Sequence, residues 1–417
     1  MNPKNYFFDL IKLFISFNIA YFYFIAPYFS YIGLIADFQF HYFLISVALI
    51  FFYSLIIKVN GEFLSDLFKI SFVIISLIPS LTLFVFNALT FGFMINWFFI
   101  FLFFIIIFNS KINFQSINSF PFSISNSFIW LLLFFSSIVY FSYFRFNLNF
   151  EYFNILSSSL YEGREEYSQT LRSLGSIRYF FSNFQNVFLP IILAYGLIRK
   201  NYPIIIFTLL FFMYVFLNST FKSILLSPVL ILSTFVIYRL FNPYLPNFLL
   251  KHSYKFILLS CLIDYFLKFP FFNGIIIRRI FFFPVLIAEK YFEYFNENGF
   301  TYFSDLPFLE YFSVNPFLYS IPKTIGNYYF YESGYMNVGF LADAYTKAGL
   351  FSVILYVIIL KILISFSDSN KNIQNQFISF SIIIVPLISL ANSSLTTTLF
   401  SHGLLLALFV SSKIKSI

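Results

Sequence analysis

Long apolar runs separated by short polar stretches make up most of this 417-residue chain. An apolar run of about 17–25 residues is long enough to cross the hydrocarbon core of a bilayer as a helix. The pattern predicts about twelve spans, near 6–29, 39–58, 69–88, 91–108, 126–144, 179–198, 202–218, 220–241, 252–271, 340–365, 376–393 and 396–413. The expected fold class is therefore all-α, a polytopic integral membrane protein.

Two longer polar stretches interrupt this pattern, at 145–178 and 272–339. The short loops between the other spans carry mostly lysine, for example Lys111, Lys200 and Lys251. Positive-inside sorting then places both termini in the cytoplasm and the two long loops on the opposite side. We expect a single membrane domain over 1–417 that carries two large extracytoplasmic loops.

Composition supports the membrane class and excludes several others. Charged residues make up 10% of the chain, against about 25% in soluble proteins. The net charge of +8 comes mainly from loop lysines, and no solvated basic domain is present to bind nucleic acid. The single cysteine, Cys261, rules out a disulfide within the chain and a CxxC metal motif.

Arginine is concentrated in the two long loops. Six of the eight arginines lie there: Arg145, Arg164, Arg172, Arg178, Arg278 and Arg279. Sorting depends only on positive charge, whereas the arginine fork also grips phosphate or carboxylate with two hydrogen bonds. The set therefore suggests an anionic ligand. The alternative is that these arginines pair with lipid headgroups or with loop acids such as Glu162, Glu165 and Glu166, in a solvated charged turn around Arg164.

The second long loop carries the densest pattern. Arg278 and Arg279 follow a span directly and precede an aromatic run that ends at Pro284, which places them at headgroup depth. Residues 285–295 then predict an interfacial helix with Glu289 and Glu293 on one face.

Acidic residues in the spans are rare and suggest pairing. Among the expected spans, only Asp264 is an internal carboxylate, and Lys268 one turn later favours an ion pair over a proton relay. Asp343 and Lys347 show the same spacing at the start of a later span. The three histidines are isolated in sequence and there is no Asp-x-Asp pair, so no metal site is indicated.

Several of these segments resemble bacterial oligosaccharide repeat-unit polymerases, the O-antigen polymerases of the Wzy type. The resemblance rests on four motifs: Arg278–Pro284, the Tyr-Phe-x-Tyr-Phe pattern at 291–295, Pro322-x-x-Ile325-Gly326, and Asn337-x-Gly339-x-x-x-Asp343-Ala-Tyr345-x-x-x-Gly349. They cover about a fifth of the chain. Asn337-Val-Gly339 stands where the family often has Asn-Thr-Gly or Asn-Ala-Gly.

The resemblance implies a GT-C-like membrane enzyme of the bacterial inner membrane. It would join repeat units carried on undecaprenyl pyrophosphate at the periplasmic face, without a cofactor. Its partners would be lipid-linked oligosaccharides, the bilayer and a chain-length regulator. The alternatives are an O-antigen ligase and a lipid-linked oligosaccharide flippase.

The same resemblance implies roles for particular residues. Arginines stabilise a pyrophosphate leaving group, and a carboxylate can take the proton of the acceptor hydroxyl. The expected catalytic residues are Asp343, Glu332 and Asn337. The expected pyrophosphate-binding residues are Arg278, Arg279, Arg164 and Arg172, of which at most one of the adjacent pair faces the phosphate squarely. For Asp343, an ion pair with Lys347 is the alternative.

Overall fold

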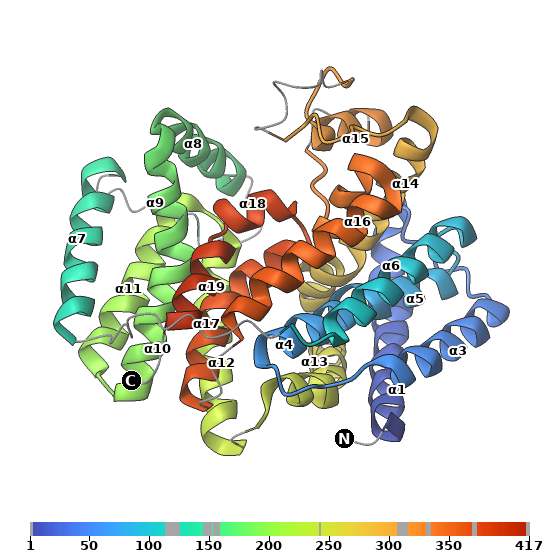
Figure 1. Ribbon diagram of the computed structural model, residues 1–417, viewed down its shortest axis with the longest axis horizontal. Coiled ribbons are helices and arrows are strands. Elements are labelled where there is room, and N and C mark those ends of the chain that lie inside the picture. Colours follow the sequence, from blue (N-terminus) through green and yellow to red (C-terminus); the bar gives the residue numbers. More distant parts are fainter. Residues whose placement is uncertain are drawn as a thin grey trace. The chain divides into compact units, whose positions relative to one another are not determined.

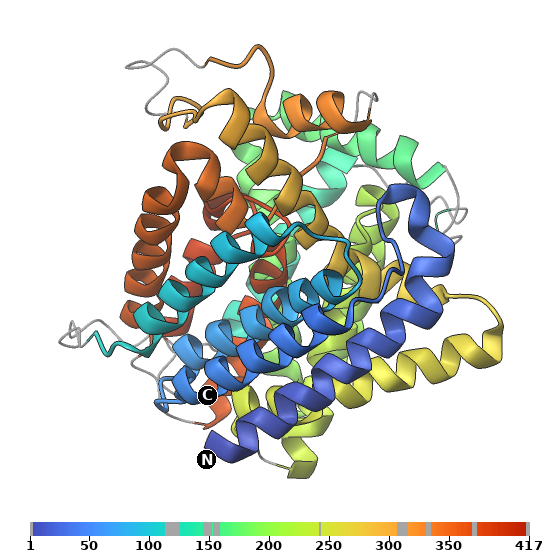
Figure 2. The same ribbon diagram turned by 90° about the vertical axis from the view of Figure 1, so that its right-hand side faces the viewer.

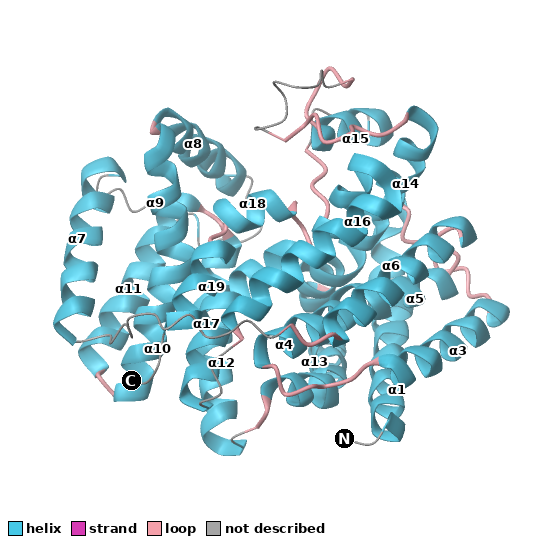
Figure 3. Cartoon of the chain, viewed as in Figure 1, coloured by secondary structure: helices cyan, strands magenta, loops and turns pink. Residues whose placement is uncertain are grey.

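Every regular element among the described residues is a helix (Figure 3). The computed structural model describes residues 3–112, 126–144, 152, 159–241, 243–306, 316–330, 335–368 and 373–413. The all-α fold class expected from the sequence is confirmed for this part of the chain.

Seven helical stretches in the described residues are long and apolar enough to cross a membrane. They are Tyr6–Ile32, Phe63–Val85, Phe91–Asn109, Gly175–Arg199, Tyr202–Ser219, Lys222–Phe241 and Phe340–Ser367. Four shorter apolar helices, Phe40–Ile56, Ile129–Phe144, Gln376–Leu390 and Leu404–Lys413, overlap other expected spans. These helices indicate a multi-pass membrane protein, and the count of twelve spans and the two large loops stay predictions.

The helices form two compact units (Figure 1). The first holds Met1–Asn113, Tyr244–Ser365 and Leu390–Leu395, and the second holds Phe114–Pro243, Phe366–Ser389 and Thr396–Ile417. Two compact units can belong to one membrane domain, so the single domain expected from the sequence stays a prediction.

The first unit contains ten α-helices and three π-helical stretches among the described residues. The α-helices are α1 (Pro3–Ala20), α2 (Ala26–Phe29), α3 (Phe40–Ile56), α4 (Phe63–Phe72), α5 (Ile78–Val85), α6 (Phe91–Asn109), α13 (Leu245–Leu267), α14 (Phe283–Asn298), α15 (Ile321–Phe330) and α16 (Phe340–Ser367). The π-helical stretches are η1 (Tyr21–Ile25), η3 (Val73–Leu77) and η7 (Asn273–Phe282), and a short 3₁₀ turn, η2 (Ser30–Ile32), follows α2.

Helix α1 joins several helices of the first unit. It packs along α13 and also contacts α3 and α5, as Figure 2 shows for α1 and α13. Leu10, Leu13, Phe14 and Phe17 are fully buried, and their helical spacing gives α1 one continuous apolar face. The π-helix η7 packs against η1 and η3, so the wide turns of three segments distant in sequence meet in the core.

The second unit is built around α10 (Leu189–Arg199), which packs against α11 (Tyr202–Ser219) and α12 (Lys222–Phe241). Its remaining elements are α7 (Asn126–Phe144), α8 (Ser159–Ser173), η5 (Gly175–Ile177), α9 (Arg178–Asn183), η6 (Phe184–Phe188), α17 (Ile373–Leu390), α19 (Leu404–Lys413) and most of α18 (Leu395–Phe400). Tyr140 is completely buried in this unit, with its ring against Phe181 and Phe211 and its hydroxyl donating to the Phe181 carbonyl.

Asp264 caps the start of η7 and does not pair with Lys268. Its carboxylate accepts hydrogen bonds from the backbone amides of Phe272 and Asn273, at 2.8 and 2.7 Å, and from the Asn273 side chain at 2.8 Å. Lys268 ends α13 in the left-handed conformation, with φ of 53°. The i, i+4 spacing gave the wrong partner because the helix stops at Leu267, so the structural role of Asp264 is to hold the α13–η7 turn.

Asp66 is a buried carboxylate in the candidate span Phe63–Val85, and Asp9 is buried in Tyr6–Ile32, whereas the sequence indicated only Asp264 as an internal carboxylate. The third span was expected to begin at residue 69, but α4 begins at Phe63. Asp66 pairs with Lys69 at 3.1 Å and accepts a hydrogen bond from the Tyr244 hydroxyl at 2.8 Å. Because Lys69 neutralises the carboxylate, the helix can start earlier within an apolar region.

Candidate functional site

The candidate site lies in the first unit, around the helix that η7 and α14 form together. The π-helix η7 has wider turns than an α-helix and lies directly before α14. It ends where the backbone amide of Phe283 donates to the Arg278 carbonyl, five residues earlier. Pro284 follows in the first turn of α14, where a missing N–H costs least. Single π-turns are frequent at functional sites, and η7 extends over ten residues.

The two arginines of η7 have different surroundings. The Arg278 guanidinium lies over the Phe29 ring, 4.0 Å from its centre, and its Nε donates to the Gly274 carbonyl at 3.0 Å. Arg278 is half-buried in this arrangement, whereas Arg279 is exposed. Arg279 is the more accessible of the two.

Helix α14 carries the Tyr-Phe-x-Tyr-Phe pattern against the segment that begins α16. The Tyr291 hydroxyl donates to the Met336 carbonyl at 2.6 Å, which fixes the chain just before Asn337. Phe292 stacks on Tyr345, with ring centres 3.7 Å apart. Two motifs that are about 50 residues apart in sequence therefore form one packed surface.

Gly339 is required by the close approach of another segment. A Cβ atom at this position would lie 2.6 Å from the Ala391 carbonyl oxygen and 3.1 Å from that of Leu390. Real side chains do not come so close, so only glycine fits between α16 and residues 390–391. Asn337, two residues earlier, is exposed.

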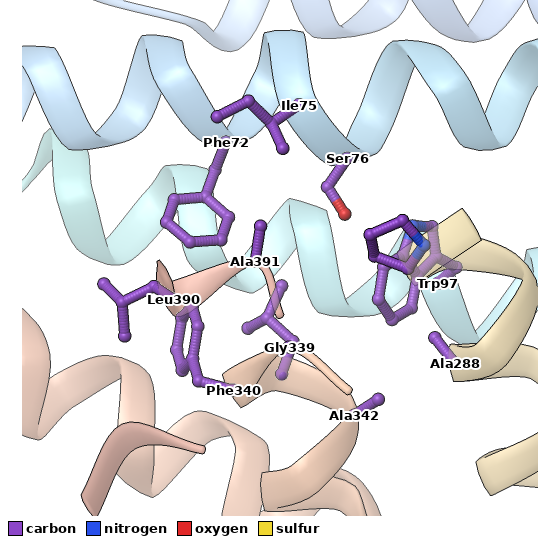
Figure 4. A pocket seen from close by; sticks show the side chains of 12 residues that line it. Phe72, Ile75, Ser76, Trp97, Ala288, Gly339, Phe340, Ala342, Leu390 and Ala391 are labelled. Atoms are coloured by element: carbon purple, nitrogen blue, oxygen red, sulfur yellow. The ribbon is translucent and has the colours of Figure 1, made fainter. Parts of the chain in front are cut away.

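A small cavity lies beside Gly339, between η3, α6, α14 and the start of α16. Figure 4 shows Phe72 and Ser76 pointing toward Gly339, Phe340 and Ala391, with Trp97 at one side. The cavity holds about 20 Å³, which is room for about one water molecule. The buried indole nitrogen of Trp97, one of the lining residues, has no protein hydrogen-bond partner.

Asp343 belongs to a group of three charges. Lys347 has a side chain that is 1% exposed, and it donates to Asp343 at 3.5 Å and forms a shorter ion pair with Asp305. Thr301 donates to the other oxygen of Asp305 at 3.0 Å. The group carries a formal net charge of −1, because two carboxylates share one ammonium. The expected pairing of Asp343 with Lys347 is present, and Asp305 is an additional member.

A break in α16 makes room for this group. Ala348 and Gly349 leave helical geometry, and Gly349 has φ of 63° and ψ of −142°, a conformation nearly restricted to glycine. The backbone amides of Thr301 and Tyr302 donate to the carbonyls of Thr346 and Lys347, each at 2.9 Å. The loop that carries Asp305 is thereby hydrogen-bonded to the break.

Ser352 satisfies the polar groups on the other side of the break. Its hydroxyl accepts from the Ala348 amide at 2.9 Å and donates toward the Ala344 carbonyl at 2.6 Å. Backbone groups that lose their helical partners are costly when buried. With Ser352 and the 299–306 loop in place, α16 can bend directly after the charged group.

Glu289 of α14 binds the backbone at the N-terminus of α6. Its Oε1 accepts a hydrogen bond from the Thr90 backbone amide at 2.6 Å. Burial raises the pKa of Glu289, and the Thr90 hydrogen bond acts in the opposite direction. The Glu289 side chain is 5% exposed, and its hydrogen bond to Thr90 joins α14 to α6.

The arginines of the first long loop lie in the second unit. Arg164 half-buries its side chain over the Phe221 ring at 5.3 Å, and a terminal nitrogen donates to the Thr220 carbonyl at 3.4 Å. Thr220 ends α11, and a cation at a helix C-terminus is favourable there. Arg172 is exposed on α8. A common site for these residues and Arg278 stays a prediction.

Two residues that the sequence analysis named are not described by the structure, and two features of the site were not predicted. Glu332 and Arg145 lie outside the described residues. Within the described residues, no group of three or more His, Cys, Asp and Glu side chains could hold a metal ion. The sequence analysis did not single out Asp305 or the break before Ser352, and the only signal for the break was Ala348-Gly349 inside an apolar run.

Comparison with known proteins adds no assignment: no family model, no curated protein and no solved structure matches this chain.

Proposed function

We propose that this chain is a membrane glycosyltransferase that joins oligosaccharide repeat units carried on undecaprenyl pyrophosphate into a surface polysaccharide. It would act at the periplasmic face of a bacterial inner membrane, with both termini in the cytoplasm. The observation that supports this most strongly is the packing of Tyr291 and Phe292 against Met336 and Tyr345. It brings together two of the sequence motifs, and the arginines of η7 begin the same continuous helix, about 20 Å before Phe292.

The proposed reaction needs two kinds of group, and the first unit offers both. The acceptor hydroxyl loses a proton to a carboxylate as its oxygen bonds to the sugar C1 of the donor. The bond from C1 to the pyrophosphate oxygen breaks, and lipid pyrophosphate leaves. Arg279, and Arg278 beside it, would stabilise the charge that develops on the leaving group. No nucleotide or metal is needed for this balance.

Asp343 is the proposed base, with Glu332 as the other candidate. Its side chain is 16% exposed and lies in the first turn of α16, six residues after the exposed Asn337. Lys347 is shared between two carboxylates, so the group keeps one unneutralised negative charge for a proton. A role of Arg164 and Arg172 in binding the pyrophosphate stays a prediction from the sequence.

Reconstitution tests the proposal directly. The purified chain in lipid nanodiscs is given undecaprenyl-pyrophosphate-linked repeat units, and products are separated by length on a gel. A ladder of products longer than one repeat supports polymerisation, and the absence of any joined product refutes it.

A deletion strain separates the proposed function from a ligase and a flippase. Loss of a polymerase leaves lipopolysaccharide core that bears one repeat unit. Loss of a ligase or a flippase leaves core alone. Core alone in the deletion strain therefore contradicts the polymerase assignment.

A further inference from the structure

An apolar groove runs along the helix formed by α1 and η1 in the first unit. Its volume is about 490 Å³, within the range of small-molecule sites. Ile15, Ile19 and Phe22 form one wall, and Phe38 and Phe86 lie opposite. The surface that lines it is hydrocarbon, which suits an apolar chain better than a sugar or a peptide.

The same helix leads from the groove to an arginine. Phe29 follows Phe22 by two turns on the continuous α1–η1–α2 helix, about 10 Å further along. The Arg278 guanidinium lies on the Phe29 ring. Helix η7 approaches so closely that a Cβ on Gly274 would lie 3.1 Å from Phe29. The Arg278 guanidinium therefore lies beyond one end of the groove, along the same helix.

We propose that the groove binds the single hydrocarbon tail of a polyprenyl diphosphate, whose head lies at Arg278 and Arg279. One groove accommodates one chain, whereas a diacyl phospholipid brings two. The Arg278 guanidinium beside Phe29 can bind a phosphate with two hydrogen bonds, and the exposed Arg279 follows it in the chain. This inference rests on the proposed function for the identity of the lipid, because the donor in that reaction is a polyprenyl diphosphate.

The experiment is photolabelling of the full chain in nanodiscs with a polyprenyl diphosphate that carries a diazirine in its tail. Ile19→Trp and Ile15→Trp fill the groove from side chains that are 36% and 45% exposed, so the core is left intact. Ile95→Trp is the matched control, because Ile95 is 44% exposed on α6 and does not line the groove. We expect labelling of the α1–η1 peptide to fall at least fivefold in the groove variants and to stay unchanged in the control.

A second probe, the matching polyprenol without diphosphate, distinguishes binding of the diphosphate head from binding of the hydrocarbon tail. Arg278→Gln should weaken labelling by the diphosphate probe and leave labelling by the polyprenol unchanged, whereas Ile19→Trp should weaken both. Excess phosphatidylglycerol should not compete. Unchanged labelling in both groove variants, or equal competition by phosphatidylglycerol, overturns the groove assignment.

These outcomes also separate the groove from the proposed function. Labelling is measured without an acceptor, so it does not depend on polymerisation. A chain that polymerises repeat units but is labelled elsewhere refutes the groove and leaves the function in place. A chain that takes up no polyprenyl diphosphate at all refutes both.

Discussion

Tyr345 lies flat on Phe292, with ring centres 3.7 Å apart and planes inclined by 13°, and its hydroxyl donates to Asn296 at 2.6 Å. The stacked rings and the hydrogen bond both join α16 to α14, and their two α14 residues, Phe292 and Asn296, are one helical turn apart. Because the two helices carry the separate motifs of the candidate site, this contact determines the relative position of its parts.

Two substitutions of Tyr345 separate the contribution of its ring to stability from that of its hydroxyl. Tyr345→Phe removes only the hydrogen bond to Asn296 and should cost about 1 kcal/mol of unfolding free energy. Tyr345→Ala also removes a ring that is 5% exposed and should cost about 3–5 kcal/mol. Equilibrium unfolding in mixed detergent and SDS measures both. Equal losses for the two variants would show that stacking contributes nothing.

Gly349→Ala should destabilise the chain by at least about 1–3 kcal/mol, because φ of 63° with ψ of −142° strains any other residue. The new Cβ would also lie 3.3 Å from the Phe300 ring. Gly92→Ala in α6 is the control, since a Cβ there meets nothing within 4 Å. The control should be neutral or slightly stabilising. Matching thermal midpoints for both variants would contradict a strained break in α16.

Lys347→Met should cost about 3–5 kcal/mol, because it leaves two carboxylates close together without their shared cation. The double variant with Asp305→Asn removes one of those charges and should recover a large part of the loss. A double-mutant cycle on unfolding free energies measures the coupling. Additive losses would mean that Lys347 and Asp305 do not interact.

Arg278→Lys and Arg279→Lys should differ in their effects on polymerisation activity and on stability. Arg279 is exposed, so its replacement should lower polymerisation about a hundredfold and lower stability less than Arg278→Lys does. Arg278→Lys also loses the Nε hydrogen bond to Gly274 and the stacking on Phe29, so it should lower stability as well. Gel ladders and thermal midpoints are compared at equal protein levels. Wild-type ladders from both variants remove the arginines from the proposed mechanism.

Glu289 gives a pH dependence with a definite sign. Burial raises its folded pKa above the ordinary value of 4.5, so the folded chain binds more protons than the unfolded chain between these two pKa values. Stability should therefore fall as pH rises from about 4.5 through the raised pKa. Glu289→Gln keeps an acceptor for Thr90 and should flatten this part of the profile. Parallel profiles of thermal midpoint against pH in wild type and variant would refute the assignment.

The sequence predicted the helices better than their connections. Apolar runs place helices because burial and bilayer length both depend on composition, and the start of α16 directly after Gly339 agrees with the motif. Asp264 and Asp66 show where this approach fails. Their partners depend on where α13 ends and α4 begins. Asp264 binds amides beyond the end of its own helix, and Asp66 binds a tyrosine distant in sequence, so a local i, i+4 pattern contains neither contact.

The site was predictable in part for the same reason. Spacing predicted the pairing of Asp343 with Lys347, because an i, i+4 relation is local. Asp305 reaches the same lysine only because the loop 299–306 hydrogen-bonds to the broken helix. No local pattern contains that information.

The ten residues of η7 have a consequence for insertions and deletions. Each wide turn accommodates one residue more than the α-helical ladder needs, so η7 can lose a residue without losing its helical character. Because a wide turn completes a full turn with one residue more, such a deletion would restore an α-helical turn and leave the segments on both sides of η7 in nearly the same orientation. The surplus residues therefore give this segment a tolerance of length: a chain with one residue fewer before Arg278 would still present the two guanidinium groups on the same side relative to α14.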